Sequence, residues 1–131
     1  MAFKVKFWGV RGSIACPGPE TVKYGGNTPC IEIRCGERVL MFDAGTGARE
    51  MGDRLIAEGI SEADLFLSHT HIDHINGFPF FSFAFNPQNR LRVWAGHLDP
   101  GLTVEGVLRS FMSDPLFPVP VDTLKGCVAL K

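Results

Sequence analysis

The sequence lacks features that would assign it to several common classes of protein. It has no apolar run near the ~20 residues that a membrane span needs, and its first residues alternate apolar and basic side chains, unlike a signal peptide. Lys and Arg (13) nearly balance Asp and Glu (14), so the charge gives no electrostatic basis for a broad nucleic-acid-binding surface. A phosphate ester held by metal ions remains compatible with that balance. We expect a soluble, cytoplasmic protein with no membrane partner.

Cysteine and tyrosine are also scarce. The four cysteines are Cys16, Cys30, Cys35 and Cys127. They form no Cys-x-x-Cys pair, do not have the spacing of a zinc ribbon, and are too few for the disulfide framework of a small secreted domain. We expect reduced, mostly buried thiols. Eleven phenylalanines against one tyrosine indicate an aromatic core or a packed apolar wall around a site.

The order of predicted elements gives the fold class. At 131 residues the chain is expected to form one domain, residues 1–131, and to bury about two thirds of its unfolded surface. Alternation predicts a half-buried strand over Phe3–Phe7, and apolar runs or periodic stripes predict the other elements. These are strands at 31–34, 39–42, 65–67, 91–95 and 127–130, and helices at 48–58 and 104–112. The result is an α/β fold, a mixed sheet with helices on one face.

A long segment rich in glycine and proline, residues 9–29, separates the first two predicted strands. Long loops inside compact domains are usually functional. Arg11 in this loop either contacts a substrate phosphate or forms a structural ion pair. The residue pattern leaves both alternatives open.

The most specific motif is His69-Thr70-His71-Ile72-Asp73-His74, directly after the predicted strand 65–67. Imidazole is the commonest metal-binding side chain, and aspartate adds an anionic oxygen. A short strand followed by a tight loop presents all four side chains to one cavity. Two metal ions fit this set better than one, because one tetrahedral ion with four protein ligands keeps no open position for substrate. A His-rich polar loop without metal is the alternative.

The His-x-His-x-Asp-His motif resembles the signature of the metallo-β-lactamase superfamily. Further segments resemble its phosphodiesterase-like branch, which is related to ribonuclease Z and cyclic-nucleotide phosphodiesterases. They are Phe7–Ile14, Gly25–Cys30, Phe42–Gly47, Gly77–Phe81 and Pro115–Pro120. The resemblance covers nearly the whole chain and implies an αββα sandwich, of which this chain is similar to the N-terminal half.

The resemblance also implies a set of metal ligands. His69 and His71 are expected to bind the first ion, and Asp73 and His74 the second. Two divalent ions, zinc or alternatively manganese or iron, would share a bridging hydroxide and hydrolyse a phosphodiester. Asp73 is in addition the candidate catalytic residue, because its carboxylate is able to orient that hydroxide by accepting its hydrogen bond.

Three other features have two interpretations each. Asp43 ends a predicted strand, and its carboxylate either orients a ligand imidazole or forms a turn or helix cap; both roles can coexist. His97 follows a strand end, where a lone histidine is more often an ordinary surface residue than a ligand. The phenylalanines between Phe78 and Phe85 are expected in the core rather than in a stacking platform.

The chain departs from the superfamily in one respect. Complete domains resemble two α/β halves packed sheet against sheet, and the second half supplies three further ligands that this sequence does not match. We expect a hydrolase-type domain truncated at its C-terminal side; completion by another copy or another polypeptide, and a non-catalytic metal-binding or assembly fragment, are the alternatives. An unpaired half exposes an apolar sheet face, so we expect association through it. Within hydrolases, another ester or a lactone is the alternative substrate.

Overall fold

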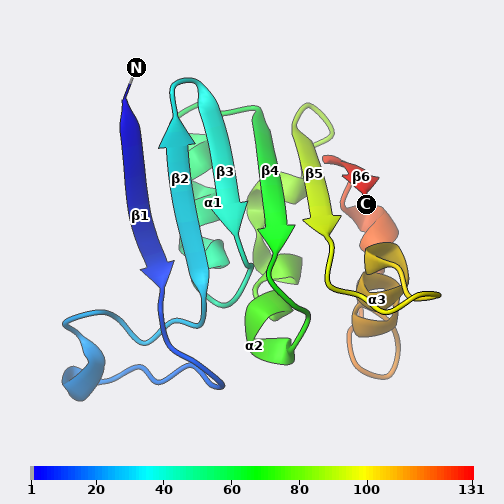
Figure 1. Ribbon diagram of the computed structural model, residues 1–131, viewed down its shortest axis with the longest axis horizontal. Helices are drawn as coiled ribbons and strands as arrows, with labels where there is room; N and C mark the ends of the chain where they lie inside the picture. Colours follow the sequence, from blue (N-terminus) through cyan, green and yellow to red (C-terminus); the bar gives the residue numbers. More distant parts are fainter. Residues whose placement is uncertain (1) are drawn as a thin grey trace.

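The structure is a computed structural model that describes residues 2–131, and it contains one six-stranded sheet with its strands in the order of the sequence (Figure 1). The strands are β1 (Phe3–Gly9), β2 (Cys30–Cys35), β3 (Arg38–Phe42), β4 (Glu62–Leu67), β5 (Arg90–Ala95) and β6 (Cys127–Leu130). β1, β2 and β3 pair antiparallel, whereas β3 to β6 pair parallel. The carboxyl ends of β3, β4 and β5 therefore meet at one edge of the sheet.

The helices lie on one side of this sheet (Figure 1). They are α1 (Ala48–Ala57), α2 (Ile72–Ile75) and α3 (Val104–Phe111), with 3-10 turns η1 (Pro19–Thr21), η2 (Phe78–Phe80), η3 (Ser82–Phe85) and η4 (Val121–Thr123). Thr103 caps α3, its hydroxyl oxygen accepting from the Gly106 amide at 3.0 Å. The core lies between sheet and helices, where Met41, Leu65 and Val93 are fully buried.

The mixed α/β fold predicted from the sequence is confirmed, and the predicted strands and helices are present within a few residues. The Phe cluster is largely core, as predicted: Phe78, Phe81 and Phe83 are buried. Phe80 is the exception, being 55% exposed and packed edge-on against Phe117. No disulfide forms among the described residues, but only Cys30 is buried; the other three thiols are partly accessible.

The prediction of a half-buried β1 is wrong. Phe3, Val5 and Phe7 are 67%, 45% and 63% exposed. β1 is an edge strand, and these side chains lie on the face of the sheet opposite the helices. Alternation correctly predicted the strand but not what covers its apolar face.

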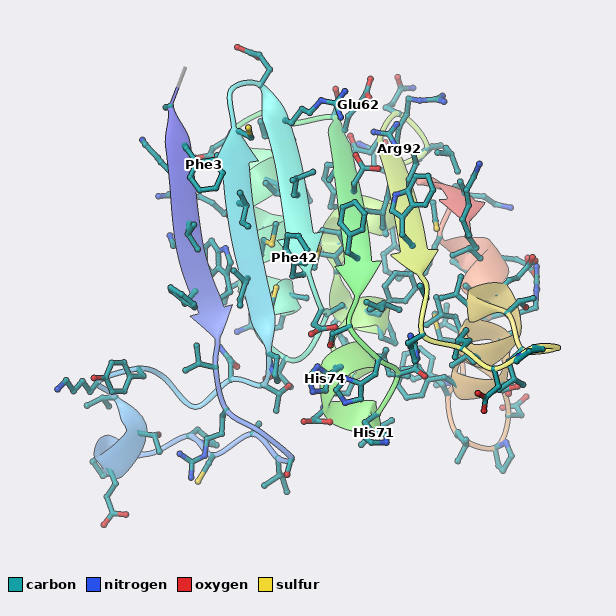
Figure 2. All side chains as sticks on the ribbon, viewed as in Figure 1. Phe3, Phe42, Glu62, His71, His74 and Arg92 are labelled. Carbon is teal, nitrogen blue, oxygen red and sulfur yellow. The ribbon has the colours of Figure 1, made fainter. Side chains whose placement is uncertain are left out.

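The face without helices carries a continuous apolar row, defined here as the bare face. The strand register aligns one residue from each of five strands: Phe7, Ile31, Phe42, Phe66 and Trp94. The Phe66 ring stacks on Phe42 and on Trp94, with centroids 5.4 and 6.2 Å apart. Figure 2 shows Phe3 and Phe42 on this near face, in front of the ribbon.

Within residues 2–131, no helix is both long and apolar enough to cross a membrane.

Candidate metal centre

The His-rich motif occupies the loop that follows β4 at the carboxyl edge of the sheet. Leu65 and Leu67 anchor the strand in the core. His71 is the N-cap residue of the single-turn helix α2, without a side-chain capping bond, and this helix carries Asp73 and His74. Figure 2 shows His71 and His74 at this edge, opposite Glu62 and Arg92. The motif is therefore presented by one short loop on a buried strand.

The four predicted ligands lie close together. The His69 ring centroid is 4.0 Å from that of His74 and 4.6 Å from that of His71. His74 Nε2 lies 3.4 Å from Asp73 Oδ2. The structure thus brings His69, His71, Asp73 and His74 into one cluster.

Asp43 holds the His74 ring in place. Its Oδ2 lies 2.9 Å from His74 Nδ1, and the same carboxylate accepts hydrogen bonds from the Ser68 amide (2.8 Å) and hydroxyl (2.7 Å). A carboxylate beside Nδ1 orients the ring and favours the tautomer whose Nε2 is free to bind a metal. The helix-cap alternative for Asp43 is wrong, because Gly47 is the N-cap of α1 and no side chain caps it. A backbone φ of 65° turns the chain at Asp43.

Asp73 is buried beside the His cluster and is fixed by the loop after β1. The backbone N–H of Ser13 donates to its Oδ2 at 2.8 Å. This hydrogen bond is the main cause that lowers the pKa of Asp73, and the neighbouring His74 lowers it further. Asp73 is therefore an anion at neutral pH.

His69 is half-buried in the cluster, whereas His71 is exposed. Desolvation, followed by the nearby imidazoles of His74 and His71, lowers its pKa from the usual value. A lowered pKa keeps the ring neutral near pH 7, which is the form that binds a metal.

The donor set fits part of a metal site. Ligands about 2.1 Å from a tetrahedral ion lie about 3.4 Å apart, which matches the separation of His74 Nε2 and Asp73 Oδ2. However, no group of three or more His, Cys, Asp or Glu side chains in residues 2–131 is arranged to hold one ion. Within these residues the geometry therefore places one pair of donors, His74 Nε2 and Asp73 Oδ2, at the separation of two ligands of one ion.

Three residues near the cluster were not identified as contacts from the sequence. Ser13 contacts Asp73, and the Ser68 hydroxyl lies 3.1 Å from His69 Nδ1 as well as bonding Asp43. His97, interpreted as an ordinary surface residue, lies with Nε2 3.3 Å from the Thr70 hydroxyl. The contact of His97 could have been inferred from the parallel pairing of β4 and β5, because both strands end at this edge of the sheet.

Arg11 forms no ion pair among the described residues, so its structural-ion-pair alternative is wrong.

The glycine-rich segments hold the loops around the cluster together by hydrogen bonds and close backbone contacts. Thr28 and Thr46 exchange hydrogen bonds, each backbone amide donating to the other's hydroxyl at 2.8 and 2.7 Å. Gly77 passes so close to Gly45 that a Cβ at Gly77 would lie 1.8 Å from the Gly45 carbonyl oxygen. Only glycine fits there. The segments 25–30, 42–47 and 77–81 therefore form one rigid support for the metal loop.

Proteins of known sequence resemble this chain over much of its length. It is 30% identical over 86 residues to a ribonuclease Z of Picrophilus torridus, an alignment covering 64% of this chain and 26% of that protein. It is 27% identical over 124 residues to a ribonuclease Z of Haloarcula marismortui, covering 93% of this chain and 37% of that protein. The chain thus spans only about a quarter to over a third of these relatives.

Solved structures share the fold. The metallo-beta-lactamase fold protein YhfI from Bacillus subtilis superimposes with a TM-score of 0.54 at 18% identity, over 100% of this chain and 47% of that one. A putative metallo-beta-lactamase from Thermotoga maritima gives a TM-score of 0.51 at 17% identity, over 98% of this chain and 59% of that one. A diphosphatase of the PhnP family gives 0.51 at 15% identity, over 73% and 42%.

The family model described as the metallo-beta-lactamase superfamily matches residues 24–122, which include the whole His-rich motif and its glycine-rich supports. This match, the shared fold and the motif lead to one assignment: the chain belongs to the metallo-beta-lactamase superfamily.

Proposed function

We propose that this chain is the metal-binding part of a metal-dependent hydrolase that cleaves phosphodiester bonds. One observation carries the proposal: Asp43 fixes His74 so that Nε2 and Asp73 Oδ2 lie 3.4 Å apart at the strand edge. The names of the relatives, ribonuclease Z and a diphosphatase, support a phosphate ester as the substrate.

Each residue of the cluster has a distinct role in this proposal. Asp73 and His74 would hold one ion, and His69 and His71 the other, with zinc as the first candidate metal. Bound divalent ions lower the pKa of water towards ~7 and screen the charge of a phosphodiester. Asp73, kept ionised by the Ser13 amide, orients the attacking water by accepting its hydrogen bond. Asp43 positions the His74 ring.

Hydrolysis of bis-p-nitrophenyl phosphate by the chain, with added Zn²⁺ or Mn²⁺, tests the proposal. We expect turnover that depends on metal and is lost in His69→Ala. The matched control is His97→Ala, which removes the imidazole outside the motif and should retain most of the rate. Turnover of a lactone panel without cleavage of the phosphodiester would favour the alternative substrate class, and metal binding without any turnover would favour a non-catalytic fragment.

We also propose that the bare face is covered by a second copy of this chain. The row of Phe7, Ile31, Phe42, Phe66 and Trp94 is a contiguous apolar patch of the kind that monomers rarely expose.

The charges of the bare face are only partly paired. Arg92 donates to both oxygens of Asp64 at 2.7 and 2.9 Å. The register also places Arg38 and Arg90 on this face, and neither forms an ion pair among residues 2–131. Both arginines begin their strands, at the end of the sheet opposite the apolar row, so a two-fold contact centred on the row would leave them at its rim.

Sedimentation over a range of concentrations tests the interface. We expect a dimer that dissociates in Phe66→Glu, which places a charge in the centre of the row. Lys125→Glu, at an exposed position outside the row, is the control and should leave the dimer intact. A monomer at all concentrations would overturn the second copy as occupant.

A further inference from the structure

The loop between β1 and β2, residues 10–29 and here named the arm, contains a second candidate site. It projects beyond the same edge of the sheet as α2 (Figure 1). A hollow of about 250 Å³ lies in the arm, with Arg11, Glu20, Lys23 and Tyr24 among its lining residues. None of these four residues has a role in the metal cluster.

The charged side chains that line this hollow are two cations and one carboxylate, Arg11, Lys23 and Glu20. In the arm, Arg11 and Lys23 have no ion-pair partner among residues 2–131. Two unpaired cations facing one hollow favour an anionic ligand.

The hollow also presents an aromatic ring. Tyr24, the single tyrosine of the sequence, is 74% exposed, and the Lys23 ammonium lies 5.2 Å from its ring centroid. An exposed ring beside cations is the arrangement on which nucleic-acid-binding proteins stack bases. The combination therefore fits a ligand that has both a phosphate and a flat ring.

Backbone hydrogen bonds fix the arm relative to the metal cluster. The Arg11 amide donates to the Asn27 carbonyl at 2.9 Å, and the Cys16 amide to the Gly26 carbonyl at 2.8 Å. Between these two ties, the Ser13 amide donates to Asp73. A ligand in the hollow would thus keep a defined position relative to the candidate catalytic residue.

We propose that the hollow of the arm binds the nucleotide unit next to the phosphodiester that is cleaved. Arg11 and Lys23 contact its phosphate, Tyr24 stacks on its base, and Glu20 accepts a hydrogen bond from the sugar or base. The volume lies below the ~300–1,000 Å³ of complete ligand pockets, as expected for a subsite that holds one part of a longer substrate. This inference rests on the proposed hydrolase function and adds a nucleotide to its substrate.

Binding of thymidine 5′-monophosphate to the metal-free chain, measured by calorimetry in EDTA, tests the subsite without catalysis. We expect tighter binding than for inorganic phosphate or thymidine alone. Arg11→Ala and Tyr24→Ala should each raise the Kd about tenfold, whereas Tyr24→Phe, which keeps the ring, should restore binding. Arg90→Ala removes an exposed arginine at the start of β5, on the opposite edge, and should leave the Kd unchanged.

Two results would overturn the subsite: no binding of the nucleotide, or the same Kd in wild type, Arg11→Ala and Tyr24→Ala. Equal affinity for inorganic phosphate and nucleotide would also overturn it, since the ring would then contribute nothing. The hydrolase proposal is tested independently, by cleavage of bis-p-nitrophenyl phosphate, because this ester contains no nucleoside. Cleavage of that ester without nucleotide binding refutes the subsite alone, and nucleotide binding without any cleavage refutes the hydrolase alone.

Discussion

Successive residues of each strand point to opposite faces of the sheet, and only one of these faces is covered by helices in the described part of the chain. Leu65 points to the helices and is fully buried, whereas its neighbour Phe66 points to the bare face and is only partly buried. The covered side belongs to one buried apolar core, whereas on the bare side Phe66 stacks on Phe42 and Trp94. Within residues 2–131, the helices therefore cover one face of the sheet and leave the other face uncovered.

The metal cluster repeats this difference at the edge of the sheet. The support of the cluster is complete, with Asp43, Ser68 and Ser13 in place around the donors. The donors lie together, but no three of them in residues 2–131 are arranged to hold one ion. The contacts that orient the cluster are thus present in the described residues, whereas a complete set of ligands for one ion is not.

Substitution at adjacent positions of β4 measures the difference between the faces and has the largest expected effect. Leu65→Ala should lower the free energy of unfolding by about 2–5 kcal/mol, because it leaves a cavity in a packed core. Phe66→Ala should cost the monomer only about 1 kcal/mol, mostly from lost ring stacking. Urea denaturation of both variants at low protein concentration provides the measurement; equal losses would show that the faces are equivalent.

The sequence predicted those elements whose signal is local. The His-rich motif after Leu65–Leu67 and the stripe of 104–112 were sufficient to predict β4 and α3. The exposure of Phe3, Val5 and Phe7 was not predictable, because alternation reports which side of a strand is apolar but not whether another layer covers it. The contacts of Ser13 and His97 depend on which loops meet at the carboxyl edge, which is set by strand order and not by neighbouring residues.

Asp43, which contacts His74 but is not itself a proposed ligand, should still affect metal affinity. Asp43→Asn keeps the size of the side chain but weakens the hold on His74 Nδ1, so zinc affinity should fall about 10–100-fold. Asp53→Asn, whose carboxylate accepts from the Ser82 hydroxyl at 3.1 Å on the covered side, should leave it unchanged. Competition with a chromophoric chelator measures both. An unchanged affinity in Asp43→Asn would show that the orientation of His74 does not matter.

The charged part of the bare face should give a smaller, pH-dependent effect. The Arg92 side chain, followed by the Trp94 indole N–H, lowers the pKa of Asp64 despite its desolvation. A lowered carboxyl pKa stabilises the folded chain above the unfolded value of about 3.9, and this contribution is lost as pH falls through the folded pKa.

Asp64→Asn removes this contribution. At pH 7 it should lower the free energy of unfolding by about 1–2 kcal/mol, because Arg92 then lacks its paired anion. The difference from wild type should shrink as the pH falls from 5 towards 2, as measured by urea denaturation across that range. Glu37→Gln, an exposed carboxylate in the turn between β2 and β3, is the control. A difference that is constant with pH would assign the effect to packing.

Native mass spectrometry of the chain during a zinc titration tests the central claim most directly, because it reads oligomeric state and metal content together. We claim that this chain supplies four donors, His69, His71, Asp73 and His74, to a site that needs further ligands and a second layer. The predicted result is a monomer with partial zinc occupancy and a dimer with more zinc per chain, both losing zinc in a His69→Ala, His74→Ala double variant. A monomer that holds two zinc ions per chain at full occupancy would contradict it.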